Sequence, residues 1–368
     1  MLDDELDDDR VPDGRGGRND GDDEDPGGPP PIPSLDDDRL LALELVRATE
    51  AAAIASARFL GRGDDDEVDG AATDAMRPVL GTIQMRGVVV IGEGEKDDSP
   101  MIYAGERIGS GQGPLVDVAI DPVDGAGLTA KGLPNAISVV ALADRGAMYD
   151  PGPCVYMDKV VVGPDLVDVV DIKAPVEDTV RAIAKARGAD VGDVTVALLD
   201  RPRHEDVARR LRTAGARIRF LLDGDLVGAL LALTDESEID MALGIGGAPE
   251  GVIAACAVKC LGGAIYGRLA PRSTTEARQA RDLGLRPDDV LTTDDLVRGN
   301  NAYLVATGVT GSELLRGVRF ARDTAITHSL AVRSASGAIR TIETKHRLST
   351  STLVPSETIS SPTDPDRA

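Results

Sequence analysis

The chain has 368 residues, 42% of them hydrophobic and 28% charged, which is typical of a globular protein with two domains or one large layered domain. A formal net charge of −23 and the absence of tryptophan argue against a nucleic-acid partner, which would need a basic surface or an aromatic stacking platform. No run approaches the roughly 18 uncharged apolar residues that a membrane span needs, and the acidic N-terminus lacks a signal-peptide core, so we expect a cytoplasmic protein.

Both ends of the chain have the composition of disordered segments. Residues 1–38 hold 15 acidic and three basic residues among many glycines and prolines, and such a segment cannot bury enough apolar surface to fold. Residues 348–368 are rich in serine, threonine and proline. We therefore expect a folded body between two disordered tails.

The first half of this body, residues 39–174, combines helices with short apolar strands. Apolar residues at three- and four-residue spacing predict a helix from Leu41 to Phe59, which ends at Gly61. A second helix is expected over 70–83, with Pro78 as a kink. Runs rich in valine and isoleucine predict strands over 88–91, 115–120, 137–142 and 160–162.

In the second half, residues 175–347, helices and strands alternate in the rhythm of an α/β fold. The fold class is therefore α+β with an α/β second half. Its expected helices cover 176–187, 204–214, 225–233 and 250–261, and its expected strands cover 194–199, 217–222, 239–243 and 264–269.

Cysteine and histidine are too rare to form a thiolate or histidine-rich metal site. The chain has three cysteines, of which Cys256 and Cys260 lie in an apolar helical stretch, where we expect small buried hydrophobic side chains. The three histidines are far apart in sequence. Any metal would therefore be a hard cation held by oxygen.

Three acidic motifs follow predicted strands or precede a predicted helix: Gly92-Glu93-Gly94-Glu95, Asp121-Pro122-Val123-Asp124-Gly125, and Gly246-Gly247-Ala248-Pro249-Glu250. Each motif alone is usually a solvated turn. Together, at the ends of rigid strands, they predict carboxylates converging at one edge of a sheet, where they suit Mg²⁺ or Mn²⁺. Such ions activate water and stabilise a leaving oxygen, so the sequence favours hydrolysis of a phosphate ester.

These motifs, taken in order with DRPRH, LLDGD and GIGGAPEGV, closely resemble class II fructose-1,6-bisphosphatases over about residues 36–347. That family is placed among the lithium-sensitive, metal-dependent sugar and inositol phosphatases. The resemblance implies a layered αβαβα sandwich, a cytoplasmic homo-oligomer, and the substrate fructose 1,6-bisphosphate, converted to fructose 6-phosphate in gluconeogenesis.

The resemblance also implies two metal positions for Mn²⁺ or Mg²⁺. Asp69 and Glu93 resemble the ligands of one ion, and Asp121, Asp124 and Glu250 resemble those of the other. Many relatives have glutamate where Asp124 stands, and aspartate keeps the charge on a shorter side chain.

Positions that contact the substrate are implied in the same way. Two arginines suit phosphate and two aspartates suit sugar hydroxyls, although a surface patch and helix capping are the plainer interpretations of these residues. The implied set is Asp124, Gly125, Ala126, Tyr156, Arg201, Pro202, Arg203, Asp223, Gly224, Asp225 and Gly247.

One position departs from the family pattern. The family motif continues Asp-Gly-Thr, with a hydroxyl beside the attacking water, but here Ala126 follows Gly125. The implied catalytic positions are Glu95, Asp124 and Ala126. Either Glu95 or Thr129 takes over the role of the hydroxyl, or the chain is a slow enzyme, an engineered inactive form or a binding-only relative. The rival functions are hydrolysis of sedoheptulose 1,7-bisphosphate or an inositol phosphate, and a non-catalytic sugar-phosphate sensor.

Overall fold

The computed structural model describes residues 38–94 and 102–349. The two predicted tails lie almost wholly outside these ranges, and Glu95 also lies outside them. Within the described residues, no helix combines the length and the apolar character that crossing a lipid bilayer requires.

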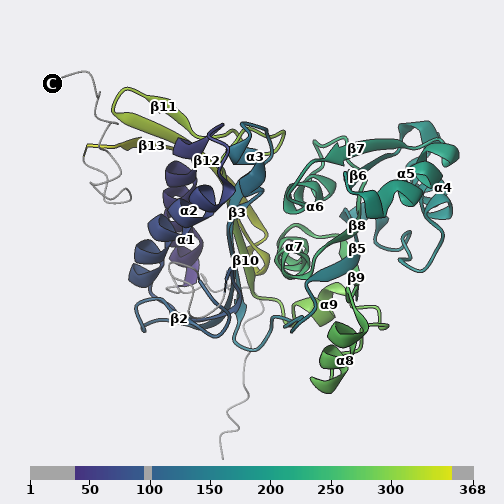
Figure 1. The fold of residues 1–368 in the computed structure, drawn as a ribbon, viewed down its shortest axis with the longest axis horizontal. Helices are drawn as coiled ribbons and strands as arrows, with labels where there is room; N and C mark the ends of the chain where they lie inside the picture. The colour runs from purple at the N-terminus through teal and green to yellow at the C-terminus, as the bar shows by residue number, and fades with distance from the viewer. Residues whose placement is uncertain (1–37, 95–101, 350–368) are drawn as a thin grey trace, which may run out of the picture. The chain divides into compact units, whose positions relative to one another are not determined.

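The larger sheet mixes parallel and antiparallel strands in the order β11-β12-β10-β4-β3-β1-β2, and β13 pairs with the other side of β12 along its length (Figure 1). β1 and β3 run parallel, whereas β3, β4, β10 and β12 pair antiparallel in succession. Its strands are β1 (Arg86–Ile91), β2 (Arg107–Ile108), β3 (Leu115–Asp124), β4 (Ile137–Asp144), β10 (Ala302–Gly308), β11 (Arg319–Ala321), β12 (Thr324–Arg333) and β13 (Ala338–Arg347).

Two long helices cover one face of this sheet. α1 (Asp38–Ser56) packs on β10, β12 and β4, and α2 (Asp65–Thr82) packs on α1 and β3. The apolar stripe predicted for the first helix is buried, as Leu45 and Ala52 illustrate. α2 begins five residues before the predicted start, because Asp64 caps it by accepting a hydrogen bond from the Glu67 N–H at 3.1 Å.

The smaller sheet has the order β7-β6-β8-β5-β9. β6 runs parallel to β7 and β8, and β5 runs antiparallel to β8 and β9. Its strands are β5 (Tyr156–Val162), β6 (Thr195–Leu199), β7 (Arg217–Leu221), β8 (Met241–Gly247) and β9 (Ala264–Leu269).

The remaining helices complete a sandwich of five layers (Figure 1). α7 contacts strands of both sheets, α6 packs beside it, and α5 packs against β7 and α4. One apolar core lies between α1, α2 and the larger sheet, a second extends from the larger sheet around α6 and α7 to the smaller sheet, and a third lies between the smaller sheet and α4 and α5. The predicted αβαβα sandwich is confirmed. These helices are α3 (Ala126–Ala130), α4 (Val176–Arg187), α5 (Glu205–Ala214), α6 (Leu226–Ala232), α7 (Ala248–Leu261), α8 (Thr274–Asp282) and α9 (Thr293–Leu296).

Most predicted elements agree with the structure, and two differences affect the site. β3 continues through Asp124 instead of ending at Ile120, with a register shift against β4 between Asp121 and Asp124. β8 likewise extends to Gly247, so that its last residues lead directly into α7. Asp121 and Asp124 therefore lie within β3 itself, and Glu250 lies in the first turn of the helix that directly follows β8.

After residue 302 the chain returns to the larger sheet, where β10 pairs between β4 and β12. The larger sheet thus takes strands from both sides of residue 174, and a domain division at that residue remains a prediction. All three cysteines are free and buried, as expected for small hydrophobic side chains.

Candidate functional site

A cavity of about 280 Å³ lies where the ends of β3, β6, β7 and β8 meet the start of α7. The residues predicted to bind metal or substrate provide most of its lining. A larger cavity of about 480 Å³, lined by the end of α6 and by β12 and β13, contains none of them. The lining of the smaller cavity is Asp124, Val155, Tyr156, Leu199, Arg201, Arg203, Asp223, Gly224, Asp225, Gly246, Gly247, Pro249 and Glu250.

The turn between β7 and α6 lies directly against Asp124. The Leu226 N–H donates to Oδ2 of Asp124 at 3.2 Å. Gly224 has φ +62°, and a Cβ there would lie 2.9 Å from the same oxygen. Only glycine combines this backbone conformation with so close an approach. The turn therefore brings the two sheets together at the carboxylate of Asp124.

Glu250 reaches the same cavity from the first turn of α7, where a helix N-terminus favours negative charge. Burial and then the charge of Asp225 raise the pKa of Glu250, and Lys159 opposes this shift. Burial and again Asp225 raise the pKa of Asp124, against the Leu226 hydrogen bond. The carboxylates of these three acidic residues therefore repel one another in a partly dry site.

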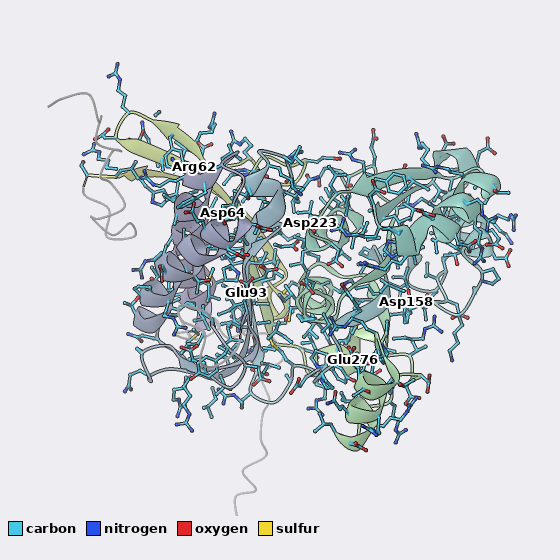
Figure 2. All side chains as sticks on the ribbon, in the orientation of Figure 1. Arg62, Asp64, Glu93, Asp158, Asp223 and Glu276 are labelled. Carbon is cyan, nitrogen blue, oxygen red and sulfur yellow. The ribbon has the colours of Figure 1, made fainter. Side chains whose placement is uncertain are left out.

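Three further predicted ligands lie within electrostatic range, on α2, after β1 and in β3. Burial and then Glu93 raise the pKa of Asp69 to about 8. Burial and then Glu250 raise the pKa of Glu93, and burial and then Asp124 raise that of Asp121. The five predicted ligands thus form one negative cluster, of which Figure 2 labels Glu93.

Several oxygens of the site are buried without a hydrogen-bond partner: Oδ1 of Asp69, Oε2 of Glu93, Oδ1 of Asp225 and Oε2 of Glu250. Among the described residues, no group of three or more acidic, histidine or cysteine side chains is arranged so that it could hold a metal ion. Like charges without a counter-ion separate, and buried orphan oxygens are what a divalent cation satisfies. The donor set thus fits an oxygen-binding divalent ion, while its arrangement is not that of a completed coordination shell.

The two arginines lie in the segment between β6 and α5 and line the same cavity. Arg201 forms an ion pair with Asp223 at 2.6 Å. Arg203 donates from Nε to the Ile245 carbonyl at 2.9 Å, and its guanidinium lies 5.0 Å from the ring centroid of Tyr156. Both guanidinium groups are therefore held beside the cavity while retaining donors for an anion.

His204 holds this arginine segment to the smaller sheet. It is buried, its Nδ1 lies 2.8 Å from the Leu199 carbonyl, and its Nε2 accepts from the Ile245 N–H at 2.8 Å. The geometry requires a neutral ring that donates from Nδ1 and accepts at Nε2. Burial lowers the pKa of His204.

We expect His204 to make the stability of the fold depend on pH. In the unfolded chain the histidine has a pKa near 6.5, whereas in the folded protein its pKa is lower. The stabilisation that the neutral ring gives the fold is therefore complete above about pH 6.5 and is lost as the pH falls below this value. Melting temperatures between pH 7.5 and 5.5 check this. The decline should be shallower in His204→Gln than in the parent, and parallel curves would contradict the expectation.

Not every predicted residue faces the cavity. The predicted residues that are not among its lining residues are Asp69, Glu93, Asp121, Gly125, Ala126 and Pro202. Thr129, an alternative source of a hydroxyl, is fully buried in α3 and does not line the cavity either.

The sequence-based prediction missed four lining residues, Val155, Leu199, Gly246 and Pro249. Gly246 and Pro249 lie inside the GIGGAPEGV motif, which could have indicated them. Val155 and Leu199 are apolar residues of ordinary sequence context and carried no signal.

A cavity that combines carboxylates, arginines and a glycine-rich strand end is typical of enzymes that act on phosphate esters. The model of the family "Bacterial fructose-1,6-bisphosphatase, glpX-encoded" matches residues 39–346. The chain belongs to this family.

The match to named relatives covers nearly the whole length of those proteins. The class 2 fructose-1,6-bisphosphatase of Haemophilus influenzae is 41% identical over 84% of this chain and 97% of its own. Fructose-1,6-bisphosphatase 1 class 2 of Escherichia coli K12 is 38% identical over 84% of this chain and 96% of its own. A solved structure of an extragenic suppressor from Pyrococcus furiosus is 12% identical, with a TM-score of 0.28 over 55% of this chain and 72% of its own, too weak a likeness to carry an argument.

Proposed function

We propose that the protein hydrolyses the 1-phosphate of fructose 1,6-bisphosphate to fructose 6-phosphate, with Mg²⁺ or Mn²⁺ as its cofactor. The observation that carries the proposal is one cavity lined both by carboxylates and by two arginines, in a chain whose family has this activity in its name. The predicted homo-oligomer, the cytoplasmic location and the place among lithium-sensitive phosphatases belong to the same proposal.

In this proposal, the five carboxylates hold the cofactor: Asp69 and Glu93 at one position, and Asp121, Asp124 and Glu250 at the other. The unpartnered buried oxygens of Asp69, Glu93 and Glu250 support the assignment. Bound divalent ions supply an activated water and stabilise the departing oxygen of the phosphate ester. The protein positions these carboxylates on strand ends and on a helix start, where the backbone is rigid.

The same proposal assigns the sugar bisphosphate to the rest of the cavity. Arg201 and Arg203 supply donors for a phosphate, and the ring of Tyr156 packs against the guanidinium of Arg203. Asp223 and Asp225 accept hydrogen bonds from sugar hydroxyls. A site with both features favours a bisphosphorylated sugar over an inositol phosphate.

Purified protein tests the proposal through phosphate release. We expect release from fructose 1,6-bisphosphate with Mn²⁺ or Mg²⁺, its loss in EDTA, and its return when the metal is added back. We expect kcat/KM to be lower on sedoheptulose 1,7-bisphosphate and on an inositol phosphate. Equal or higher kcat/KM on either alternative would assign the site to that substrate instead.

One observation favours a second candidate, a sugar-phosphate sensor with little turnover. Ala126 lacks the hydroxyl of the family motif, and Thr129 is fully buried and cannot replace it without leaving the core. A sensor predicts saturable, metal-dependent binding of fructose 1,6-bisphosphate without phosphate release. Calorimetry beside the release assay separates the two functions.

A further inference from the structure

A buried lysine lies next to a carboxylate of the candidate site. Lys159, in β5, is only 6% exposed, and among the described residues it is the only lysine or arginine in the buried class. A buried ammonium group is costly unless it is paired. Its partners therefore indicate what the fold uses it for.

Both partners of Lys159 belong to the candidate site. Its Nζ lies 2.7 Å from Oδ2 of Asp225 and donates to the Gly247 carbonyl at 2.6 Å. A Cβ at Gly246 would lie 1.7 Å from Oδ2 of Asp225 and 3.1 Å from Nζ, so the absence of a side chain there makes this ion pair possible. The lysine thus joins the acidic turn before α6 to the end of β8.

Lys159 itself is not among the residues that line the 280 Å³ cavity, whereas Asp225 is. The ion pair occupies Oδ2 of Asp225 and leaves Oδ1 buried without a partner. Asp225 lines the cavity, and a carboxylate fixed in this way keeps one preorganised acceptor that suits a hydroxyl donor.

We infer that Lys159 is a positioning residue that holds the carboxylate of Asp225 in the orientation in which its free oxygen accepts a hydrogen bond from a hydroxyl of the bound sugar phosphate. The inference rests on the proposed function and extends it to a residue that does not contact the substrate. In this role Lys159 acts on the sugar through Asp225, so the loss of either residue removes the same hydrogen bond to the sugar, while its bond to the Gly247 carbonyl fixes the end of β8.

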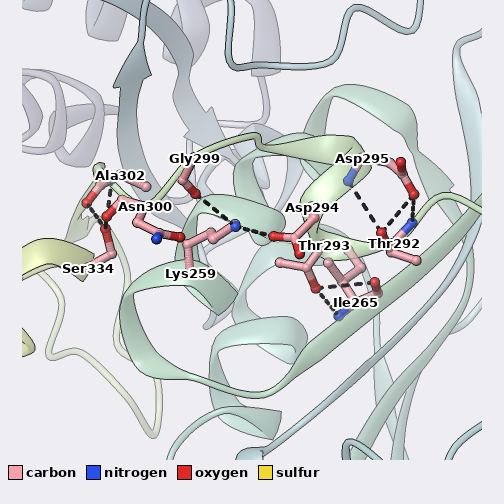
Figure 3. A network of polar contacts seen from close by, with 10 residues as sticks. All are labelled: Lys259, Ile265, Thr292, Thr293, Asp294, Asp295, Gly299, Asn300, Ala302 and Ser334. Atoms are coloured by element: carbon pink, nitrogen blue, oxygen red, sulfur yellow. Dashed lines mark hydrogen bonds and ion pairs between the residues drawn. The ribbon is translucent and has the colours of Figure 1, made fainter.

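The chain offers a matched control. Lys259 in α7 also bridges an aspartate and a glycine carbonyl, Asp294 and Gly299, and donates to the latter at 2.9 Å (Figure 3). The side chain of Lys259 is largely buried, with 11% of it exposed. None of these three residues lines the candidate cavity. Lys259→Met therefore removes a similar bridge without touching the proposed sugar site.

The experiment is calorimetric titration of the product, fructose 6-phosphate, in Mg²⁺, which measures binding without turnover. We expect Lys159→Met and Asp225→Asn each to weaken binding by about 10- to 100-fold, the range for a hydrogen bond to a charged group. The double variant should bind no more weakly than Asp225→Asn alone, because both changes remove one interaction. Lys259→Met should bind like the parent.

Two further variants keep the test decisive. Lys159→Arg keeps the cation and should retain more affinity than Lys159→Met. If Lys159→Met does not fold, Lys159→Gln replaces it in the cycle, since glutamine can still donate to Gly247 but carries no charge.

The role of Lys159 would be overturned if Lys159→Met or Lys159→Gln bound fructose 6-phosphate like the parent. It would also be overturned if the double variant lost affinity by the product of the two single losses. Either result would leave the proposed function intact. A parent protein that neither binds fructose 6-phosphate nor releases phosphate would overturn both.

Discussion

Glu250→Gln is expected to abolish metal-dependent phosphate release and to weaken binding of Mn²⁺ by at least about 100-fold, since the loss even of a group that only supports a metal ligand costs roughly 10- to 100-fold. The amide keeps the shape of the side chain and removes its charge. Glu250 carries a buried oxygen without a partner and lies in the electrostatic range of Glu93, Asp124 and Asp225. Titration calorimetry with Mn²⁺ measures the effect directly.

The same substitution should not destabilise the metal-free fold, because it removes one of several repelling charges. In EDTA we expect Glu250→Gln to melt at or above the temperature of the parent, and in Mn²⁺ to lose most of the stabilisation that the ion gives the parent. This opposite response in the two buffers distinguishes a ligand from a merely structural carboxylate.

Asp240→Asn is the matched control. Asp240 is another buried carboxylate, but it is fully paired, with the Thr195 N–H at 2.6 Å and with Arg187 at 2.5 Å. We expect this variant to be less stable by about 1–3 kcal/mol and to bind Mn²⁺ like the parent. If Glu250→Gln bound Mn²⁺ normally, the proposed ligand set would be wrong.

Local patterns predicted the bounds of several elements of the fold. The helix over 176–187 and the strand over 264–269 have the predicted bounds, because apolar periodicity and glycine boundaries are local signals. The sequence predicted that the acidic motifs meet at one edge of a single sheet, but Asp124 ends a strand of the larger sheet and Glu250 follows a strand of the smaller one. They line the same cavity because the two sheets meet there, which no local pattern could indicate.

Long-range pairing left no such signal. Nothing local to β10 or β12 specifies that they pair in the larger sheet after the chain has passed through the smaller one. Lys159 illustrates the same limit within the site. In sequence it lies between Asp158 and the apolar run 160–162, where an exposed side chain would be expected. Its partner Asp225 becomes apparent only when β5 and the turn before α6 are folded together.

Ala126→Thr is expected to raise kcat on fructose 1,6-bisphosphate by about 100-fold or more, within the roughly 10²- to 10⁴-fold range of general acid–base assistance. Ala126 begins α3, two residues after Asp124, and is only 9% exposed. By the family pattern, a hydroxyl at this position orients the attacking water, and the methyl group of alanine cannot. KM and the affinity for Mn²⁺ should change little, because the predicted ligands and arginines are untouched.

Ala126→Val controls for the shape of the new side chain. Valine has the branched form of threonine without the hydroxyl, so it reproduces any steric cost of filling a nearly buried position at the start of α3. A gain with threonine and none with valine would show that the chain is a phosphatase lacking one hydroxyl. Equal kcat in parent, threonine and valine variants would mean that another group activates the water, and Glu95 would then be the next residue to replace. If none of the three proteins releases phosphate although each binds fructose 1,6-bisphosphate, the sensor is favoured. Restoring the hydroxyl to a site that binds the substrate would then not restore hydrolysis.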